Sequence, residues 1–234
     1  MNQAVRRTRI DGEQTRARLL QVAGRLFGER GFAATSSKLV AEQAGADLAS
    51  INYHFGNRQG LHQAVLAEAH RQLLDMEELR QIVDLPEPPA TRLHRLIVAL
   101  VSAPRNPDAG WCLPVLAAEF LSPSSQLGLL FQEEVQPKAQ LLMRLLAEVS
   151  GLSIDDPALL RCAMSVVGPF VLLMLARNGL PGPAAQVNRM PADEIVEHLF
   201  RFSLGGLQAI AQQRPCADRH TGQGGCDDER CERC

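Results

Sequence analysis

The stretch from residue 35 to residue 58 constrains the fold more than any other part of the chain. Hydroxyl residues open it and can cap a short helix, and Gly45 can turn the chain without a steric penalty. Asp47 can cap a second short helix that ends near Phe55, and Asn57 can cap a third. Two short helices joined by a glycine turn predict a helix-turn-helix, which can place its second helix in the major groove of DNA.

The distribution of charge supports the same interpretation. Over all 234 residues the net charge is −2. Residues 1–66 contain nine Lys/Arg and five Asp/Glu, a net of +4, whereas residues 67–234 contain 15 against 21, a net of −6. A basic N-terminal head on an acidic body indicates that only the head meets phosphate. A helix-turn-helix can also be a mere packing corner, but the charge division disfavours that alternative.

Apolar residues recur at helical spacing along most of the chain, and sustained strand-type alternation is absent, so we predict an all-α protein. Outside the two short helices, the expected helices cover 13–30, 57 to about 79, 90–103, 111–121, 125–149, 156–178 and 192–212. Proline- and glycine-rich segments predict loops at 85–89 and 104–110. Pro137 and Gly168–Pro169 are expected to kink their helices.

The second short helix has an inner and an outer face. Ile51 and Phe55, four residues apart, are expected to hold it in the core. The residues expected on or near the outer face are Leu48, Ala49, Ser50, Asn52, Tyr53 and His54. Ser50 and Asn52 can bond base edges or phosphates, and the small Ala49 allows close approach to thymine methyl groups. Tyr53 and His54 can also donate to phosphates. Lys38 and Arg58 suit phosphate as well, because each lies near the start of a helix.

Three runs of sequence carry a family resemblance: Arg16 to Ser36, Val-Ala-Glu-Gln-Ala-Gly at 40–45, and Ile-Asn-Tyr-His-Phe-Gly-Asn-Arg-Gln-Gly-Leu at 51–61. Together they resemble the DNA-binding domain of the TetR family over about residues 11–72. The resemblance implies an all-helical homodimer whose N-terminal heads bind a palindromic operator and whose C-terminal helices bind an inducer and dimerise. By position, it gives a recognition segment at 35–54, with Tyr53, His54 and Arg58 contacting the DNA backbone.

The DNA-contact candidates are therefore Thr35, Ser36, Ser37, Lys38, Gly45, Asp47, Leu48, Ala49, Ser50, Asn52, Tyr53, His54 and Arg58. One departure from the family pattern is Asn57-Arg58-Gln59, where Ser-Lys-Glu is common. Arg58 keeps the positive charge, but Gly60 lacks the carboxylate of a capping box.

The C-terminal part is similar to the CerR/CecR-like group of these regulators. The similar residues are Gly110 to Pro114 followed by Glu119, and the run from Ser165 to Pro169. The resemblance implies a drug- or xenobiotic-type inducer. Side chains that can line its pocket, or simply fill the core, are Trp111, Cys112, Met143 and Met164. His62, His94 and His198 have no neighbouring cysteine or carboxylate cluster, and we expect surface or helix-packing roles for them.

We divide the chain into a basic flexible arm (1–10), a helix-turn-helix domain (11–72), a helical ligand-binding and dimerisation domain (73–213) and a disordered cysteine-rich tail (214–234). The start lacks the apolar run of a secretory signal. The uncharged run between Arg161 and Arg177 has 15 residues, fewer than the roughly 20 that span a bilayer. We therefore expect a cytoplasmic protein without a membrane partner, and a buried or dimer-interface role for that run.

Two functional alternatives come from other classes. Cys216, Cys226, Cys231 and Cys234 lie close together in the tail with His220 among them, which could make a metal or thiol sensor. Their irregular spacing in a polar segment favours an unstructured tail, so neither a metal nor a cofactor is expected. An enzyme is the third class, but the chain has no Ser/His/Asp order, no glycine-rich phosphate loop and no His-Glu-x-x-His. The sequence thus predicts a DNA-binding regulator and not an enzyme.

Overall fold

The computed structural model describes residues 2–103, 110–179 and 181–212, with the backbone alone for residues 2–10. Every regular element in these ranges is helical, which confirms the all-α prediction. The elements are α1 (Asn2–Arg30), α2 (Ser37–Gln43), α3 (Leu48–Phe55), α4 (Arg58–Leu73), α5 (Met76–Asp84), α6 (Pro89–Ser102), α7 (Cys112–Leu121), α8 (Leu127–Leu130), a π-helical turn η3 (Phe131–Val135), α9 (Gln136–Ser150), α10 (Pro157–Arg177), α11 (Pro183–Val187) and α12 (Ala192–Gln212).

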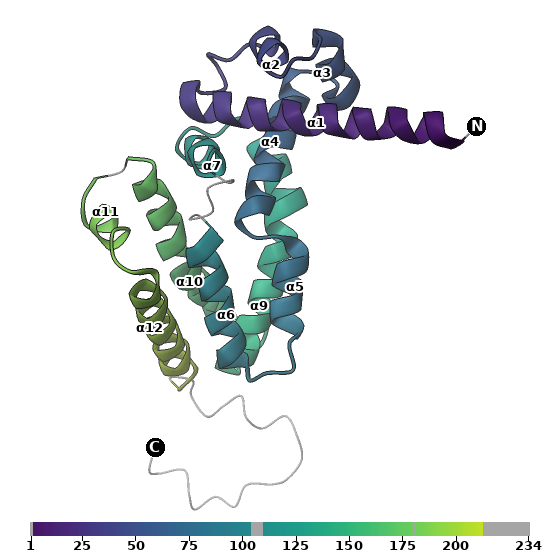
Figure 1. Ribbon diagram of the computed structural model, residues 1–234. Coiled ribbons are helices and arrows are strands. Elements are labelled where there is room, and N and C mark those ends of the chain that lie inside the picture. Colours follow the sequence, from purple (N-terminus) through teal and green to yellow (C-terminus); the bar gives the residue numbers. More distant parts are fainter. Residues whose placement is uncertain (1, 104–109, 180, 213–234) are drawn as a thin grey trace, which may run out of the picture.

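The elements form a head above a body. Helix α1 lies across the top of the body, and α2 and α3 stand above it (Figure 1). Helix α4 leaves the head, runs down toward α5 and packs against α8 and η3, while α7 lies beneath α1 (Figure 1). Helices α10 and α12 form the opposite side of the body from α5 (Figure 1). Since α4 belongs to both parts, a displacement in the body can reach the head along it.

The caps that the sequence predicts for the head are confirmed. The side chains of Ser36, Asp47 and Asn57 each accept a hydrogen bond from the backbone N–H three residues further on, at 3.2, 2.7 and 2.9 Å. These bonds satisfy N–H groups that a helix start leaves without partners. Gly45 has φ of +61°, a backbone conformation that costs other residues energy. Local chemistry therefore sets the boundaries of α2, α3 and α4.

Two helix boundaries differ from the prediction. Helix α1 begins at Asn2, so residues 2–10 continue the helix that was expected to start near residue 13. The single helix expected from 57 to about 79 is wrong, because it breaks at Leu74. There Asp75 caps α5 by accepting hydrogen bonds from the N–H groups of Glu77 and Glu78, at 2.8 and 3.3 Å. A side chain that can cap a new helix competes with continuation of the old one.

The expected kink at Pro137 takes the form of a π-helical turn. Proline has no N–H to donate, and its ring clashes with the carbonyl four residues earlier. The helix widens into a π-helical turn just before Pro137. There the N–H of Gln136 donates a hydrogen bond to the carbonyl of Phe131, five residues earlier. Residues 125–149, predicted as one helix, therefore form three elements: α8, η3 and α9. The sequence prediction also missed the short helix α11. The cysteine-rich tail and most of the loop at 104–110 lie outside the described residues.

The hydrophobic core of the head continues into the body. Buried residues of α1, α3 and α4, among them Leu19, Ile51 and Leu61, form one cluster with Val115 of α7 and with Trp111, which directly precedes α7. The body has two further clusters, one centred on α6, α9, α10 and α12 and a smaller one between α5, α6 and α9. Because α7 contributes to the core of the head, the two parts share apolar contacts that a flexible hinge would lack.

Helix α10 combines a long apolar sequence with few fully buried side chains. It spans 21 residues, and its most apolar window has a mean hydropathy of 2.1. By length and composition it is the one helix in the described part of the chain that could cross a membrane. From the 15 uncharged residues between Arg161 and Arg177, the sequence predicted a segment too short to cross a membrane. Only 22% of that window is buried within the chain, so much of the helix needs a partner or remains in water.

Candidate nucleic-acid interface

Helix α3 presents one face to the core and the other to solvent. Ile51 is fully buried and Phe55 is half-buried, so both anchor the helix as predicted. On the other side Asn52 is exposed, and Tyr53 and Leu48 are 84% and 50% exposed. A tyrosine and a leucine with so little contact to the chain contribute little to its stability. Their side chains are available to another molecule.

Two predicted contact residues are engaged with each other at the start of α3. The hydroxyl of Ser50 donates to Oδ1 of Asp47 at 2.7 Å, and the N–H of Ser50 donates to the same oxygen at 2.7 Å. These hydrogen bonds stabilise the carboxylate, and the pKa of Asp47 is lowered, first by the hydroxyl and then by the N–H. Asp47 therefore acts as a cap. Ser50 can meet DNA only by sharing or giving up this bond.

The side chains of Arg58 and Thr35 donate hydrogen bonds to backbone carbonyls of the head itself. The guanidinium of Arg58 donates to the backbone carbonyls of Thr35 (3.0 Å from Nε) and Phe32, and it lies 4.1 Å from the centre of the Phe32 ring. Thr35 is 1% exposed, and its hydroxyl donates to the carbonyls of Gly31 (3.0 Å) and Leu26 (3.3 Å). In this conformation both side chains tie the loop before α2 to the rest of the head.

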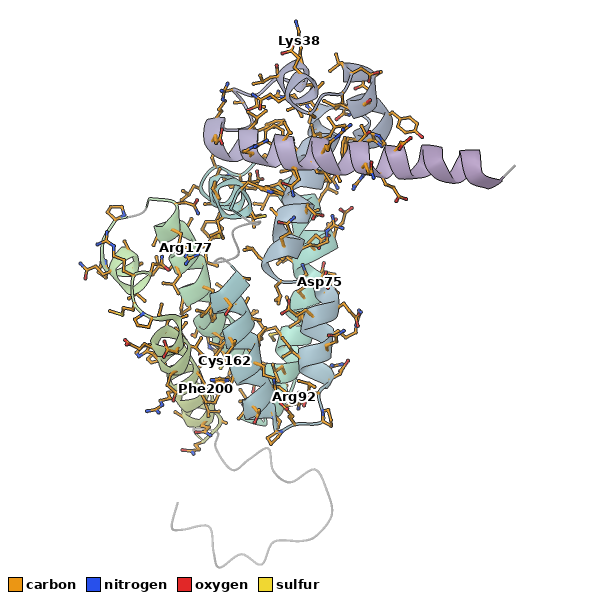
Figure 2. The ribbon with its side chains drawn as sticks, viewed as in Figure 1. Lys38, Asp75, Arg92, Cys162, Arg177 and Phe200 are labelled. Carbon is orange, nitrogen blue, oxygen red and sulfur yellow. The ribbon has the colours of Figure 1, made fainter. Side chains whose placement is uncertain are left out.

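The remaining head candidates divide by exposure. Lys38 projects from the top of the head (Figure 2), and its side chain is 80% exposed, with Glu42 at 3.8 Å. Such an exposed pair contributes little and leaves the ammonium available to phosphate. Ala49 and Gly45 are exposed, Ser36 is exposed at its cap, and Ser37 is half-buried. His54 is half-buried beside the ring of Tyr53, with ring centres 4.8 Å apart.

The four ligand-pocket candidates do not meet at one site. Trp111 is buried where α7 meets α1, and its ring lies so close to Gly24 that a β-carbon there would be 2.3 Å away. Cys112 donates from Sγ to Oε1 of Gln72 at 3.1 Å, and burial raises its pKa to about 12. Met143 packs at the edge of the body core, and Met164 is 69% exposed on α10.

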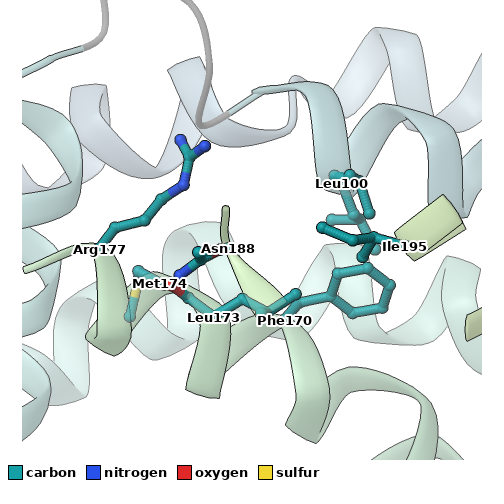
Figure 3. Close-up of a pocket in the computed structure, with 8 residues that line it drawn as sticks. Leu100, Phe170, Leu173, Met174, Arg177, Asn188 and Ile195 are labelled. Atoms are coloured by element: carbon teal, nitrogen blue, oxygen red, sulfur yellow. Dashed lines mark hydrogen bonds between the residues drawn. The ribbon is translucent and has the colours of Figure 1, made fainter. Parts of the chain in front are cut away.

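Two hollows are present instead. A cleft of about 470 Å³ lies between α1 and α7 and has Trp111 in its wall. A cavity of about 20 Å³ lies between α6, α10 and α12, room for about one water molecule. Figure 3 shows Leu100, Phe170 and Ile195 on one side of it and Arg177 on the other. The residues of this cavity were not predicted from the sequence, in which only the charge of Arg177 at the end of an apolar helix points to the site.

No group of His, Cys, Asp and Glu side chains in the described ranges could hold a metal ion. The tail candidates Cys216, Cys226, Cys231 and Cys234 fall outside those ranges. The site that remains is the exposed face of α3 together with Lys38. It combines a hydrogen-bonding amide, a phenol and an ammonium on a rigid, capped frame. These groups suit base edges and phosphates.

Comparison with known proteins places the chain in a family of DNA-binding regulators. Residues 19–65 match the family model of bacterial regulatory proteins of the tetR family. Residues 89–207 match the C-terminal domain of the HTH-type transcriptional dual regulator CecR. That regulator from Shigella flexneri is 26% identical over 180 residues, covering 72% of this chain and 79% of its own. The regulator TtgR from Pseudomonas putida is 41% identical over 66 residues, 28% of this chain and 31% of its own.

A solved structure shares the architecture. The transcriptional regulator of the TetR/AcrR family from Thermobifida fusca aligns with a TM-score of 0.56 and 25% identity, covering 82% of this chain and 97% of its own. The match to the CecR-type domain alone spans more than half of the chain, and the tetR-type match covers the helix-turn-helix. The protein is therefore a DNA-binding transcriptional regulator of the TetR family, with a C-terminal domain of the CecR type.

Proposed function

We propose that this regulator is a ligand-responsive repressor that binds a palindromic operator as a homodimer in the cytoplasm. The exposed face of α3 carries the proposal. Asn52 and Tyr53 project from a helix whose opposite face is fixed in the core by Ile51. We assign them, with Lys38 and Ala49, to DNA contact. Ser36 and Asp47 cap helices, Ser50 donates to the Asp47 carboxylate, and Thr35 and Arg58 hold the loop before α2, so these five position the contact residues.

The exposed apolar surface of α10 and α12 supports the homodimer. Its large side chains are Leu160, Met164 and Leu172 on α10 and Phe202 and Ile210 on α12, which are 38 to 69% exposed. Gly168, Gly205 and Gly206 have open space around the position of a β-carbon, which allows helices of another copy to come close. An apolar surface of this kind marks an interface. Two heads held by it would meet half-sites one or more turns of DNA apart, roughly 34 Å per turn.

The cleft between α1 and α7 supports the response to a ligand. Its volume of about 470 Å³ lies within the range of about 300–1,000 Å³ that holds small molecules. One wall belongs to the head, with Gln21 and Arg25, and the other to the body, with Trp111 and Pro114. A ligand that fits one arrangement of these walls better than another shifts the head by its differential affinity. The cavity of Figure 3 would have to open to serve this purpose.

Selection of bound DNA from a random pool tests the proposal. Recovery of an inverted repeat would support both the DNA contact and the two-fold dimer, and the spacing of its halves would report the separation of the heads. A single unrepeated site would contradict the homodimeric operator complex. Recovery of no sequence above the starting pool would contradict sequence-specific binding. The same selection with the Asn52→Ala and Tyr53→Ala double variant is the control, and it should enrich the repeat far more weakly.

A further inference from the structure

A buried polar pair lies where the body meets the head. His62 of α4 and Glu119 of α7 are 4% and 5% exposed, and Nε2 of His62 lies 3.9 Å from Oε2 of Glu119. That separation is longer than a hydrogen bond. Removing a carboxylate and an imidazole from water costs free energy unless they find partners. At this distance the two side chains attract each other electrostatically only when the imidazole is protonated.

The surroundings of His62 connect it to the helix-turn-helix. Its ring stacks on Phe32 (centres 4.1 Å apart, planes at 14°) and meets Phe27 edge-on at 5.5 Å. Phe32 also contacts the guanidinium of Arg58, 4.1 Å from the ring centre. Nδ1 of His62 is buried and has no hydrogen-bond partner within the described residues. The imidazole thus has one nitrogen without a partner and the other just beyond reach of a carboxylate.

Both ends of this cluster hold backbone segments in place. Arg58 donates to the carbonyls of Phe32 and Thr35 in the loop that leads into α2. Oε1 of Glu119 accepts from the N–H and the hydroxyl of Ser124, at 2.9 and 2.8 Å, in the turn after α7. The contacts form a continuous series from the turn after α7 to the loop before α2. A change at His62 can therefore act on the body and on the head together.

We propose that His62, Glu119 and Arg58 form a proton-sensitive joint that couples the body to the DNA-binding head. A protonated His62 attracts the Glu119 carboxylate and repels the Arg58 guanidinium. The first effect draws α7 toward α4, and the second loosens the anchor of the loop before α2. Operator binding weakens as a result. This inference extends the proposed function. Its test by operator affinity rests on the proposal that the protein binds an operator.

The charges around His62 determine the pH range. Burial is the largest influence and lowers the pKa of His62 below 6.5, Glu119 raises it, and Arg58 lowers it. Phe27 and Phe32, the side chains of α1 and of the following loop that meet the imidazole, are uncharged. His62 is therefore neutral at pH 7.5 and takes up its proton below pH 6.5. Because the folded pKa is depressed, this group's contribution to stability is complete above pH 6.5 and falls on acidification.

The single tryptophan provides a measurement that needs no DNA. Trp111 directly precedes α7, the helix that carries Glu119, and its ring packs on Gly24 of α1. Its emission therefore reports the junction of α1 with α7. Acidification from pH 7.5 to 5.0 should shift the emission of the wild type, and the shift should be absent in His62→Gln. His198→Gln, at an exposed site on α12, is the matched control and should titrate like the wild type.

Two further measurements keep the proposal testable if His62→Gln does not fold. Glu119→Gln keeps the acceptor for Ser124 but removes the charge, so it should move the emission transition to lower pH. In the unaltered protein, the imidazole proton resonance of His62 should titrate with a midpoint below 6.5. An identical emission transition in the wild type and His62→Gln would overturn the joint, as would a His62 resonance that does not titrate before the protein unfolds.

Operator affinity tests the consequence for function. With DNA recovered by selection, the wild-type Kd should rise at least about fivefold between pH 7.5 and 5.5, the lower end of common allosteric couplings. His62→Gln should lose most of this change. Equal pH responses in the two proteins would overturn the joint even though both bind DNA. Absence of DNA binding by the wild type at pH 7.5 would instead contradict the proposed function, and the emission titration would still decide the joint.

Discussion

The head and the body expose opposite kinds of surface from the same kind of helix. In the head, the outer face of α3 carries Asn52 and Tyr53 around a fully buried Ile51. In the body, the outer faces of α10 and α12 carry large apolar side chains such as Met164 and Phe202. A polar exposed face suits the grooves and phosphates of DNA, whereas an apolar one suits another protein surface. Exposure indicates an interaction site in each case, and its chemistry indicates the partner.

The largest expected effect concerns the core that the head shares with α7. Leu61→Ala removes a fully buried side chain of α4 from that core and should lower the free energy of unfolding by about 3 kcal/mol. Urea unfolding followed by Trp111 emission and by circular dichroism measures it. Both signals should move together, because Trp111 belongs to the same core. Separate transitions would show that head and body unfold independently. Leu121→Ala, at a site 71% exposed, should change stability by less than about 0.5 kcal/mol.

The next effect concerns the apolar face of the body. Phe202→Asp places a charge in the proposed dimer interface, where the wild-type ring is 68% exposed in the single chain. The free energy of dimerisation should fall by about 2 to 3 kcal/mol, the range of a central interface residue. Analytical ultracentrifugation over a dilution series measures it. Leu121→Asp is the control, because Leu121 is as exposed but lies on α7. Equal association of the two variants would place the interface elsewhere.

A third effect comes from His70, a half-buried histidine of α4. Burial and the charge of Lys138, in that order, lower the pKa of His70 to about 4, and Nδ1 lies 2.9 Å from the Lys138 ammonium, which can only donate. The unfolded histidine binds a proton near pH 6.5, so the stability that His70 contributes is complete above pH 6.5 and is lost toward pH 4. Stability should fall by roughly 2 kcal/mol between pH 7 and 4.5 from this residue. His70→Gln should flatten that part of the profile, and an unchanged profile would contradict the assignment.

The sequence predicted the parts of the head that depend on neighbouring residues. Ser36, Asp47 and Asn57 cap the helices that follow them, as expected, because a cap involves bonds only three residues long. The break at Leu74 could have been predicted by the same rule, since Asp75 is followed by Glu77 and Glu78 in the first turn. The π-helical turn before Pro137 was only partly foreseen, because proline predicts a disruption without predicting its form.

The sequence could not predict contacts that depend on packing between distant helices. Arg58 has the charge of a phosphate ligand, yet its guanidinium bonds carbonyls more than 20 residues earlier in the chain. His62 and Glu119 come together only because α4 and α7 pack side by side. Met143 and Met164 were grouped by residue type, but rotation of their helices places one at the core edge and the other on the surface. Residue type thus suggests chemistry, and packing decides whether the residue is available for it.

The smallest effect in free energy, and the most direct test of the central claim, is operator binding by Asn52→Ala and Tyr53→Ala. Each variant should weaken the complex by about 1 to 2 kcal/mol, roughly tenfold, without a measurable change in folding stability. Fluorescence anisotropy at fixed salt with the selected operator measures it, and Gln81→Ala, at an exposed site on α5, is the control. Loss of affinity in the two α3 variants alone would support DNA contact through this face. Wild-type affinity and an unchanged salt dependence in both would contradict it.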